Sequence, residues 1–415
     1  MNRNTFFPVF LILLCACSAQ KKLSYIDFSN LYNKPICEPE LKIFHLSRDS
    51  SLLYFSFNMN DLLFKKNESG SMSAALGLEY SLYNSYRSTM ILDSASINEQ
   101  INYDSTGSGY TGQVAFYALY GNNYILKIKF IDLNRTTNYT YTINVIKTGK
   151  QSSQFFDMRY LDDQPYMKGE IQQNEKVKII PPELLFDSLT VRCYFRDFPL
   201  APPPFSEIPS AKFEYTADSI YYLKLSALNS VGFSQRGFYH FQIDTLTKDG
   251  YSVYVFNDDF PAFTSPEPLI ESLRYLCTRS EYNDLSAKMD KKKAIDDYWL
   301  AKAGNNERGR KLIRTYYNRT LMANKLFTSY LEGWKTDRGM IYIIFGPPQK
   351  VYRDKMYETW RYSVSEGMPV IQFNFNKIQN AFSENDFELE RNLNYQSIWY
   401  QAVDTWRSGR IVGEN

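Results

Sequence analysis

Two histidines are the only imidazole side chains in the 415-residue sequence, and they limit the catalytic chemistry that it could perform. His45 and His240 fall in different predicted domains, and the sequence nominates no serine or cysteine nucleophile beside either. Nucleophilic catalysis of the Ser-His or Cys-His type needs the imidazole within hydrogen-bond reach of the nucleophile. The sequence also lacks clustered Cys and His ligands for zinc, a phosphate-binding Gly-x-x-x-x-Gly-Lys loop and a dinucleotide fingerprint. It therefore predicts no catalytic residue, no metal site and no cofactor.

Adjacent carboxylates are the remaining candidates for chemistry. Three acidic pairs occur, Asp162-Asp163, Asp258-Asp259 and Asp296-Asp297. Two carboxylates on either side of a glycosidic bond can hydrolyse it. Such adjacent pairs are, however, usually solvated turn or helix residues. A carboxylate-dependent hydrolase is therefore the minor alternative to a protein without enzymatic activity.

Cys17 offers a different chemistry, the acylation of its thiol. Residues 6–14 form an apolar run that is too short to cross a bilayer as a permanent helix. Leu14 stands three places before Cys17, and the small residue Ala16 directly precedes it, which resembles the lipobox of bacterial lipoproteins. We predict that residues 1–16 are a signal peptide and that Cys17 is the lipid-bearing N-terminus. Two or more acyl chains would make the anchor stable.

The charge balance argues against a nucleic-acid partner. The sequence has 47 basic and 45 acidic residues, and no basic block stands out. A surface that tracks phosphates would need clustered Lys and Arg. The 34 Tyr and 29 Phe residues instead favour β-sheets and protein-binding surfaces.

The pattern along the chain predicts a spacer and two β domains. Residues 17–40 lack sustained periodicity and are predicted to separate the lipidated Cys17 from the first domain. Residues 41–150 and 151–257 each contain short alternating runs between turn residues, such as Tyr124–Phe130, where apolar and polar side chains alternate as in a half-buried strand. Each region is predicted to be a sandwich of the Ig-like type. The proline-rich stretch Phe198–Phe205 cannot join a central strand, so an edge or loop is expected there.

From residue 258 the apolar period becomes helical. Ser265 is a predicted N-cap with Pro266 in the first helical position. Further helices are predicted over Lys291–Ala303 and from about Glu307 to Leu331, and a closing helix over Ser397–Trp406. The overall prediction is a multidomain chain, with two all-β domains followed by an α+β domain at 258–415 whose helices pack on an antiparallel sheet.

A long motif follows the third predicted helix. Gly333-Trp334-Lys335-Thr336-Asp337-Arg338-Gly339 precedes the apolar run 340–345, Gly346-Pro347-Pro348 and the predicted strand Tyr357–Tyr362. In this order the segments closely resemble the GWxTD domain, a bacterial envelope module common in Bacteroidetes. The resemblance covers roughly residues 260–415 well and the β region before it more loosely. It implies an architecture but no established biochemical activity.

Each motif residue has a predicted structural role. Gly333 would end the helix in the left-handed conformation, Trp334 would anchor the turn, and Thr336 and Asp337 would bond turn amides. The run 340–345 would be a strand that the following glycine and prolines end. The residues interpreted as structural are Gly333, Trp334, Thr336, Asp337, Arg338, Gly339, Gly346, Pro347 and Pro348. In the alternative interpretation, Asp337 and Arg338 form a polar binding site for a peptide or carbohydrate with Glu358 and Arg361.

Five Asp-Ser or Asp-Thr pairs in the β regions resemble sites that Bacteroidetes O-glycosylate in exported proteins. Each pair is followed by a small or apolar residue or by Thr. The motif is short, and Asp-Ser is also common in turns, so chance accounts for some of the matches. The predicted acceptor hydroxyls belong to Ser94, Ser105, Ser188, Ser219 and Thr245.

These observations favour a non-catalytic lipoprotein of the outer membrane that faces the periplasm and acts as a binding or scaffold component. Ser18 after Cys17 suits outer-membrane sorting, and the lack of acidic residues directly after Ser18 argues against display on the cell surface. The expected partners are the membrane, through the lipid anchor, and other envelope proteins. The resemblance points to a secretion or assembly machine. The alternative is an envelope hydrolase or carbohydrate-binding protein that uses acidic and aromatic residues near the Trp334–Asp337 turn.

Overall fold

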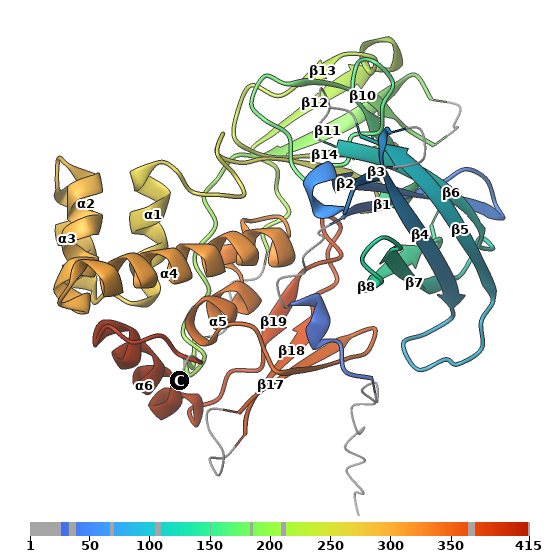
Figure 1. The fold of residues 1–415 in the computed structure, drawn as a ribbon. Coiled ribbons are helices and arrows are strands. Elements are labelled where there is room, and N and C mark those ends of the chain that lie inside the picture. The colour runs from blue at the N-terminus through green and yellow to red at the C-terminus, as the bar shows by residue number, and fades with distance from the viewer. Residues whose placement is uncertain are drawn as a thin grey trace, which may run out of the picture.

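The computed structural model places two β regions beside a C-terminal region of helices and sheet. It describes residues 26–32, 39–66, 70–103, 109–149, 151–182, 186–208, 213–363 and 370–413. The predicted signal peptide, Cys17 and Ser105 lie outside these residues. Figure 1 shows the first β region on the right, the second at the top, and the helices on the left. In the described residues, no helix combines the length and the apolar character needed to cross a bilayer.

The first β region consists of two antiparallel sheets that share one core. Leu126, Ile128 and Phe130 alternate along one strand and are fully buried, as the sequence pattern predicts, and they meet Leu53 and Phe57 from the other sheet. One sheet has the order β1-β2-β6 and comprises β1 (Glu40–His45), β2 (Ser50–Asn58) and β6 (Gly109–Tyr117). The other comprises β3 (Lys65–Lys66), β4 (Met72–Tyr83), β7 (Asn123–Asp132) and β8 (Thr137–Ile146) in that order, with β5 (Asp93–Asn102) paired to β4.

The second β region also has two antiparallel sheets around one core. Leu189, Val191 and Cys193 face this core from the central strand β11, and Val177 meets them from the other sheet. The four-stranded sheet comprises β12 (Ser219–Lys224), β11 (Ser188–Tyr194), β14 (Gly237–Gln242) and β15 (Tyr251–Val255) in that order. The three-stranded sheet comprises β13 (Val231–Gly232), β10 (Lys176–Ile180) and β9 (Asp157–Arg159).

The C-terminal region confirms the predicted combination of helices with an antiparallel sheet. The helix predicted over Lys291–Ala303 has these bounds in the structure, and Ser265 precedes a helix that begins with Pro266. The helices are α1 (Pro266–Ser272), α2 (Arg279–Ala287), α3 (Lys291–Ala303), α4 (Asn306–Phe327), α5 (Asp337–Phe345) and α6 (Tyr395–Arg407). The sheet comprises β16 (Lys350–Arg353), β17 (Tyr357–Tyr362), β18 (Ile371–Lys377) and β19 (Phe387–Leu389) in that order.

The strand predicted over residues 340–345 is wrong, because this segment forms the helix α5. Every side chain from Met340 to Phe345 is buried. A segment that is buried on all sides shows neither the period of a strand nor that of a helix, so its β-branched residues were a misleading guide. The prediction that Gly333 ends the preceding helix is also wrong, because α4 ends at Phe327 and no left-handed φ occurs at Gly333.

The prediction that residues 17–40 are a spacer fails for residues 26–32, which are built into the C-terminal region. The backbone N–H of Phe28 donates to the Val351 carbonyl of β16 over 2.8 Å, and the Val351 N–H donates to the Asp27 carboxylate over 2.9 Å. The ring of Tyr32 packs against those of Phe327 and Trp360, with centroids 5.3 and 5.2 Å away. The segment closes a core that belongs to residues some 300 positions later in the chain.

The proline-rich stretch Phe198–Phe205 forms no strand, as predicted, and it leaves the second β region to run along the C-terminal region. The Ala201 N–H donates to the Lys335 carbonyl over 2.9 Å. The ring of Phe205 lies 5.3 Å from that of Tyr400 on α6. This stretch therefore joins the second β region to the turn before α5.

Candidate functional site

The motif turn before α5 is a closely packed corner. Trp334 is 2% exposed. Its backbone N–H donates to the Asn324 side chain over 3.1 Å, and its backbone carbonyl accepts from the Tyr275 hydroxyl over 2.9 Å. A Cβ on Gly333 would stand 1.9 Å from the carbonyl oxygen of Ala323. The predicted anchoring role of Trp334 agrees with this burial. The requirement for glycine at position 333 comes from close approach to α4.

Thr336 caps α5. Its hydroxyl accepts from the Gly339 N–H over 3.0 Å and donates to the Gly333 carbonyl over 2.7 Å. A Cβ on Gly339 would lie 1.9 Å from that same carbonyl. At the other end, Gly346 has a φ of +82° and its missing Cβ leaves room for the guanidinium of Arg319. Arg319 donates to the carbonyls of Ile343 and Ile344 and so satisfies the last turn of the helix.

Asp337 and Arg338 point into the protein rather than toward solvent. One oxygen of Asp337 accepts from the Leu389 N–H over 2.8 Å, and the other pairs with Arg391. Burial raises the pKa of Asp337 although the charge of Arg391 opposes this. Arg338 donates to the Asn385 carbonyl over 2.9 Å, and its guanidinium lies 4.1 Å from the centre of the Phe387 ring. Both residues therefore hold α5 against β19 and the loop before it.

Glu358 on β17 is the centre of a buried charged cluster. Its carboxylate accepts from the Tyr32 hydroxyl over 2.6 Å and pairs with Arg353 over 2.9 Å and with Arg338 over 3.7 Å. The Trp360 indole N–H donates to it over 2.5 Å. Burial opposes ionisation, but the two arginines and the two hydrogen bonds outweigh it and lower the pKa of Glu358. Glu358 and Arg338 are almost fully buried in this cluster, and Arg353 is partly exposed at its edge.

This geometry argues against the alternative interpretation, in which the turn is a polar binding site. Arg338 pairs with Glu358, whereas Asp337 pairs with Arg391, and all of Asp337, Arg338 and Glu358 are buried. Arg361 stands apart on the exposed face of β17, where it donates to the Gln372 side chain over 3.1 Å. Neither Asp337 nor Glu358 is exposed, so neither carboxylate could contact a ligand at the turn together with Arg361.

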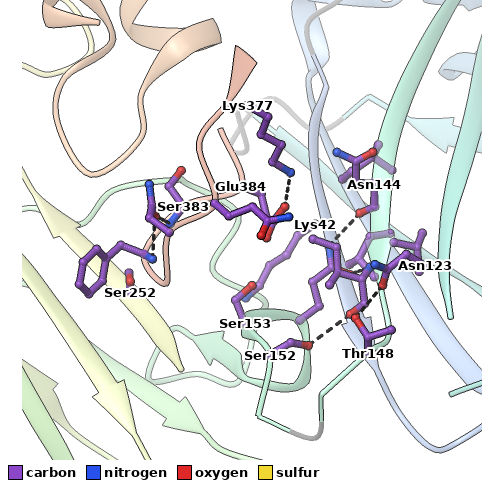
Figure 2. A pocket seen from close by; sticks show the side chains of 18 of the residues that line it. Lys42, Asn123, Asn144, Thr148, Ser152, Ser153, Ser252, Lys377, Ser383 and Glu384 are labelled. Carbon is purple, nitrogen blue, oxygen red and sulfur yellow. Dashed lines mark hydrogen bonds and ion pairs between the residues drawn. The ribbon is translucent and has the colours of Figure 1, made fainter. Parts of the chain in front are cut away.

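A cleft of about 690 Å³ lies elsewhere, where the three regions of the chain meet. The first β region contributes β1, the β4–β5 loop, the start of β7 and the end of β8. The second contributes β15 and the segment before β9, and the C-terminal region contributes the β18–β19 loop. A volume of this size is typical of ligand sites, which often form between domains. Figure 2 shows polar side chains that converge on the cleft: Lys42, Asn123, Asn144, Thr148, Ser152, Ser153, Ser252, Lys377, Ser383 and Glu384.

Most of the polar side chains in the walls of the cleft are neutral amides and hydroxyls, and apolar side chains lie between them. Asn123 and Thr148 are hydrogen-bonded to each other over 3.0 Å, and the Gln154 amide donates to the Asn144 carbonyl over 2.9 Å. The Tyr86 hydroxyl donates to the side-chain oxygen of Asn144 over 2.9 Å. These contacts hold the side chains in place. Fixed amides can both donate and accept, so the cleft suits a ligand with the same mixed character.

The charges that line the cleft nearly balance, with four lysines (Lys42, Lys168, Lys355 and Lys377) and three carboxylates (Asp249, Asp354 and Glu384). Lys42 donates to the fully buried Asp157 over 3.0 Å, and burial lowers the pKa of this lysine against the opposing charge of Asp157. Lys377 pairs with Glu384 across the β18–β19 loop. The walls therefore favour neutral polar groups over a strongly charged ligand.

Both histidines are paired with serines in the structure, which the sequence did not reveal. His45 Nδ1 lies 2.9 Å from Ser51 Oγ and His240 Nδ1 lies 2.9 Å from Ser252 Oγ. Each Nε2 faces a backbone carbonyl, and burial lowers the pKa of each imidazole to about 4. Ser252 reaches the cleft, but its histidine is buried and too weak a base to activate a hydroxyl near neutral pH.

The adjacent carboxylates stand in the solvated positions that the sequence suggests. Asp162 and Asp163 lie in an exposed turn, and Asp296 and Asp297 lie on the exposed face of α3. Asp259 accepts from the backbone N–H groups of the two residues before α1. Within the ranges given above, no group of three or more His, Cys, Asp or Glu side chains could hold a metal ion.

Residues 237–408 match the family model of the GWxTD domain. The chain carries a GWxTD domain. It matches no curated protein.

The matched residues begin at β14, inside the second β region. Phe238 on β14 lies 4.9 Å from Phe382 in the β18–β19 loop, and its ring stacks on Tyr194 at 4.5 Å. The β14–β15 pair thus packs against the helices and sheet of the GWxTD domain through a shared aromatic cluster. This packing explains why the match extends upstream of residue 258.

The predicted glycosylation acceptors that the structure describes lie at or near the surface. Ser94, Ser219 and Thr245 are exposed, and Ser188 is half-buried at the start of β11. The Asp218 carboxylate beside Ser219 accepts from the Phe195 N–H over 2.7 Å. At least this Asp has a structural role whether or not its neighbour carries a glycan.

Sequence reasoning missed the cleft and the role of Tyr32. The cleft residues come from three regions, and none belongs to a recognisable motif, so no local signal marks them. Phe28, Leu31 and Tyr32 do have an apolar spacing that a short packed turn would use, and this pattern was the available clue.

Proposed function

We propose that this protein is a non-catalytic, lipid-anchored component of the cell envelope that binds an extended segment of another envelope protein in the cleft. The observation that carries the proposal is the cleft itself, with its fixed amides and hydroxyls from three regions of the chain. An extended peptide presents alternating N–H and C=O groups along its length. Side chains that both donate and accept can satisfy such a backbone without reading a particular sequence.

A peptide fits the cleft better than a carbohydrate does. Sugar rings place their apolar faces on exposed aromatic rings. The aromatic side chains in the described walls are buried, as Tyr86 and Phe382 are, or half-buried, as Tyr251 and Tyr254 are. Neither pair offers a flat exposed ring to a sugar.

The hydrolase alternative at the GWxTD turn has little geometric support. Glycoside hydrolysis needs two accessible carboxylates on either side of the scissile bond. Asp337 and Glu358 are buried, and arginines neutralise both. We therefore assign the turn a structural role and place binding in the cleft.

The anchor and the location complete the proposal. Acylation of Cys17 would hold the protein to the inner leaflet of the outer membrane, facing the periplasm. Each β region, with two antiparallel sheets around one core, is compatible with the Ig-like sandwiches that serve in recognition. Glycosylation at one or more of Ser94, Ser105, Ser188, Ser219 and Thr245 would be added after export.

Site-specific photo-crosslinking in intact cells tests the cleft. A benzophenone amino acid at Gln379, which is exposed in the cleft wall, is expected to form an adduct with an envelope protein. The same probe at Tyr222, which is exposed on β12, is the matched control and should form none. Mass spectrometry of the adduct should locate the crosslink in one contiguous segment of the partner.

A blocking variant decides whether the adduct reports binding in the cleft. Ser153→Trp places a large side chain at the exposed edge of the cleft and should abolish the adduct at Gln379 while leaving the unfolding midpoint unchanged. An adduct that survives this substitution, or that forms equally at Tyr222, would contradict the proposal.

A further inference from the structure

The loop between β4 and β5 exposes large apolar side chains near its C-terminal end. Met90 is 66% exposed and Ile91 is 50% exposed. The loop is closed at its base by a hydrogen bond of 2.8 Å from the Leu92 N–H to the Leu82 carbonyl. Neighbouring apolar side chains that protrude into water in this way commonly mark a surface that contacts a membrane or another molecule.

This loop contacts the N-terminal segment. The rings of Tyr86 in the loop and Phe28 in the segment meet edge to face at 5.6 Å. Met90 stands four residues after Tyr86, so at most about 14 Å of extended chain separates them. Ile26, two residues before Phe28, is 56% exposed. Figure 1 shows the loop and the start of the described chain on the same lower side of the molecule.

The length of the chain between Cys17 and this face is short. Ile26 is nine positions after Cys17, which corresponds to at most about 32 Å of fully extended chain. Asp27 and Phe28 are hydrogen-bonded to Val351 of β16. The distance between Cys17 and this face therefore cannot increase further unless these hydrogen bonds break. An acyl group on Cys17 would therefore keep this face close to the bilayer.

The basic side chains near the face are suited to phospholipid head groups, whereas the carboxylate of the exposed Asp27 accepts hydrogen bonds from the backbone N–H groups of Ser29 and Val351. Arg87, next to Tyr86, and Lys350, next to Val351, are both exposed. Basic side chains beside protruding apolar ones are the usual composition of a surface that lies on an anionic membrane.

We propose that Met90, Ile91 and Ile26 form a membrane-contact face that inserts into the boundary between head groups and acyl chains of the bilayer that holds Cys17. The proposal rests on the lipid anchor assigned above. It fixes an orientation, with the β4–β5 loop and the N-terminal segment toward the membrane and the α2–α3 end of the helices away from it.

Depth-dependent quenching tests this orientation. The lipidated full chain is reconstituted in vesicles of phosphatidylethanolamine and phosphatidylglycerol that contain a spin-labelled lipid. A fluorophore is attached at Met90→Cys, and the signal from the parent protein's own cysteines is subtracted. The matched controls are Met289→Cys between α2 and α3 and Leu246→Cys after β14, both at almost fully exposed apolar residues. We expect at least threefold stronger quenching at position 90 than at either control, and Ile91→Asp should reduce it to the control level.

The outcomes separate this inference from the anchor. The intact mass of the N-terminal peptide reports acylation of Cys17 independently. If Cys17 is acylated and all three positions are quenched equally, the membrane-contact face is overturned and the anchor stands. If no acyl group is found on Cys17, both fail.

Discussion

At Glu358, partners from separate parts of the chain meet on one carboxylate. Tyr32 comes from the N-terminal segment, Arg338 from α5, and Arg353 from β16. A buried charge costs several kcal/mol unless it is paired, so the cluster is stable only when all its members are in place. The residue thus couples the packing of the GWxTD domain to the docking of the N-terminal segment.

Glu358→Gln should strongly destabilise the protein. The amide has no charge to neutralise Arg353, and removal of one partner of a buried pair costs about 3–5 kcal/mol. Because the folded pKa of Glu358 lies below its ordinary value of 4.5, its contribution to stability is complete above that value and is lost as the pH falls toward the lowered folded pKa. The difference between variant and parent should therefore shrink at acidic pH. Urea unfolding from pH 7 downward measures it.

The matched control is Glu79→Gln, which breaks the solvent-exposed pair between Glu79 and Lys129. Exposed pairs contribute about 0–1 kcal/mol, so this change should be nearly neutral. Equal losses for the two variants would contradict the role assigned to the buried cluster.

At the scale of elements, α5 depends on its surroundings more than on its own residues. The segment Met340–Phe345 is rich in isoleucine, which favours strands. It becomes a helix because Thr336 caps its start, Arg319 satisfies its last carbonyls, and α4 and the sheet bury it on every side. The GWxTD turn sets the direction of α5 relative to α4.

Gly333→Ala should therefore disrupt this packing. The added methyl group would stand 1.9 Å from the Ala323 carbonyl, and backbone atoms cannot yield as a flexible side chain could. We expect a loss of roughly 3 kcal/mol, the upper range for overpacking, in the free energy of unfolding. Gly169→Ala is the control, because nothing lies within 4 Å of its Cβ position and its stability should hold. An unfolding midpoint for the Gly333 variant equal to that of the control would refute the account of the corner.

At the scale of the whole molecule, the N-terminal segment binds the regions together. The Asn30 side chain donates to the Thr140 carbonyl of the first β region over 3.3 Å. Tyr32 packs in the hydrophobic core of the C-terminal region. The proline-rich stretch makes the corresponding connection from the second β region. These connections join the three regions that line the cleft.

Tyr32→Phe should loosen this connection. The variant loses a hydrogen bond to a buried carboxylate, which is worth about 1.5–3 kcal/mol. Hydrogen exchange should become faster in residues 26–32 and at the Val351 amide, which bonds to Asp27. Tyr222→Phe, at an exposed position, should change neither. A loss of stability without faster exchange in residues 26–32 would show that the segment stays docked and that the coupling is absent.

The sequence alone determined those features whose causes are local. The alternation along β7, the bounds of α3, the anchoring of Trp334 and the GWxTD match all depend on neighbouring residues or on a continuous motif. Tertiary structure decided the helical state of residues 340–345, the docking of Tyr32 on Glu358 and the cleft. Each of these depends on contacts between residues far apart in the chain, whose burial and pairing energies exceed local preferences and leave no periodic trace in the sequence.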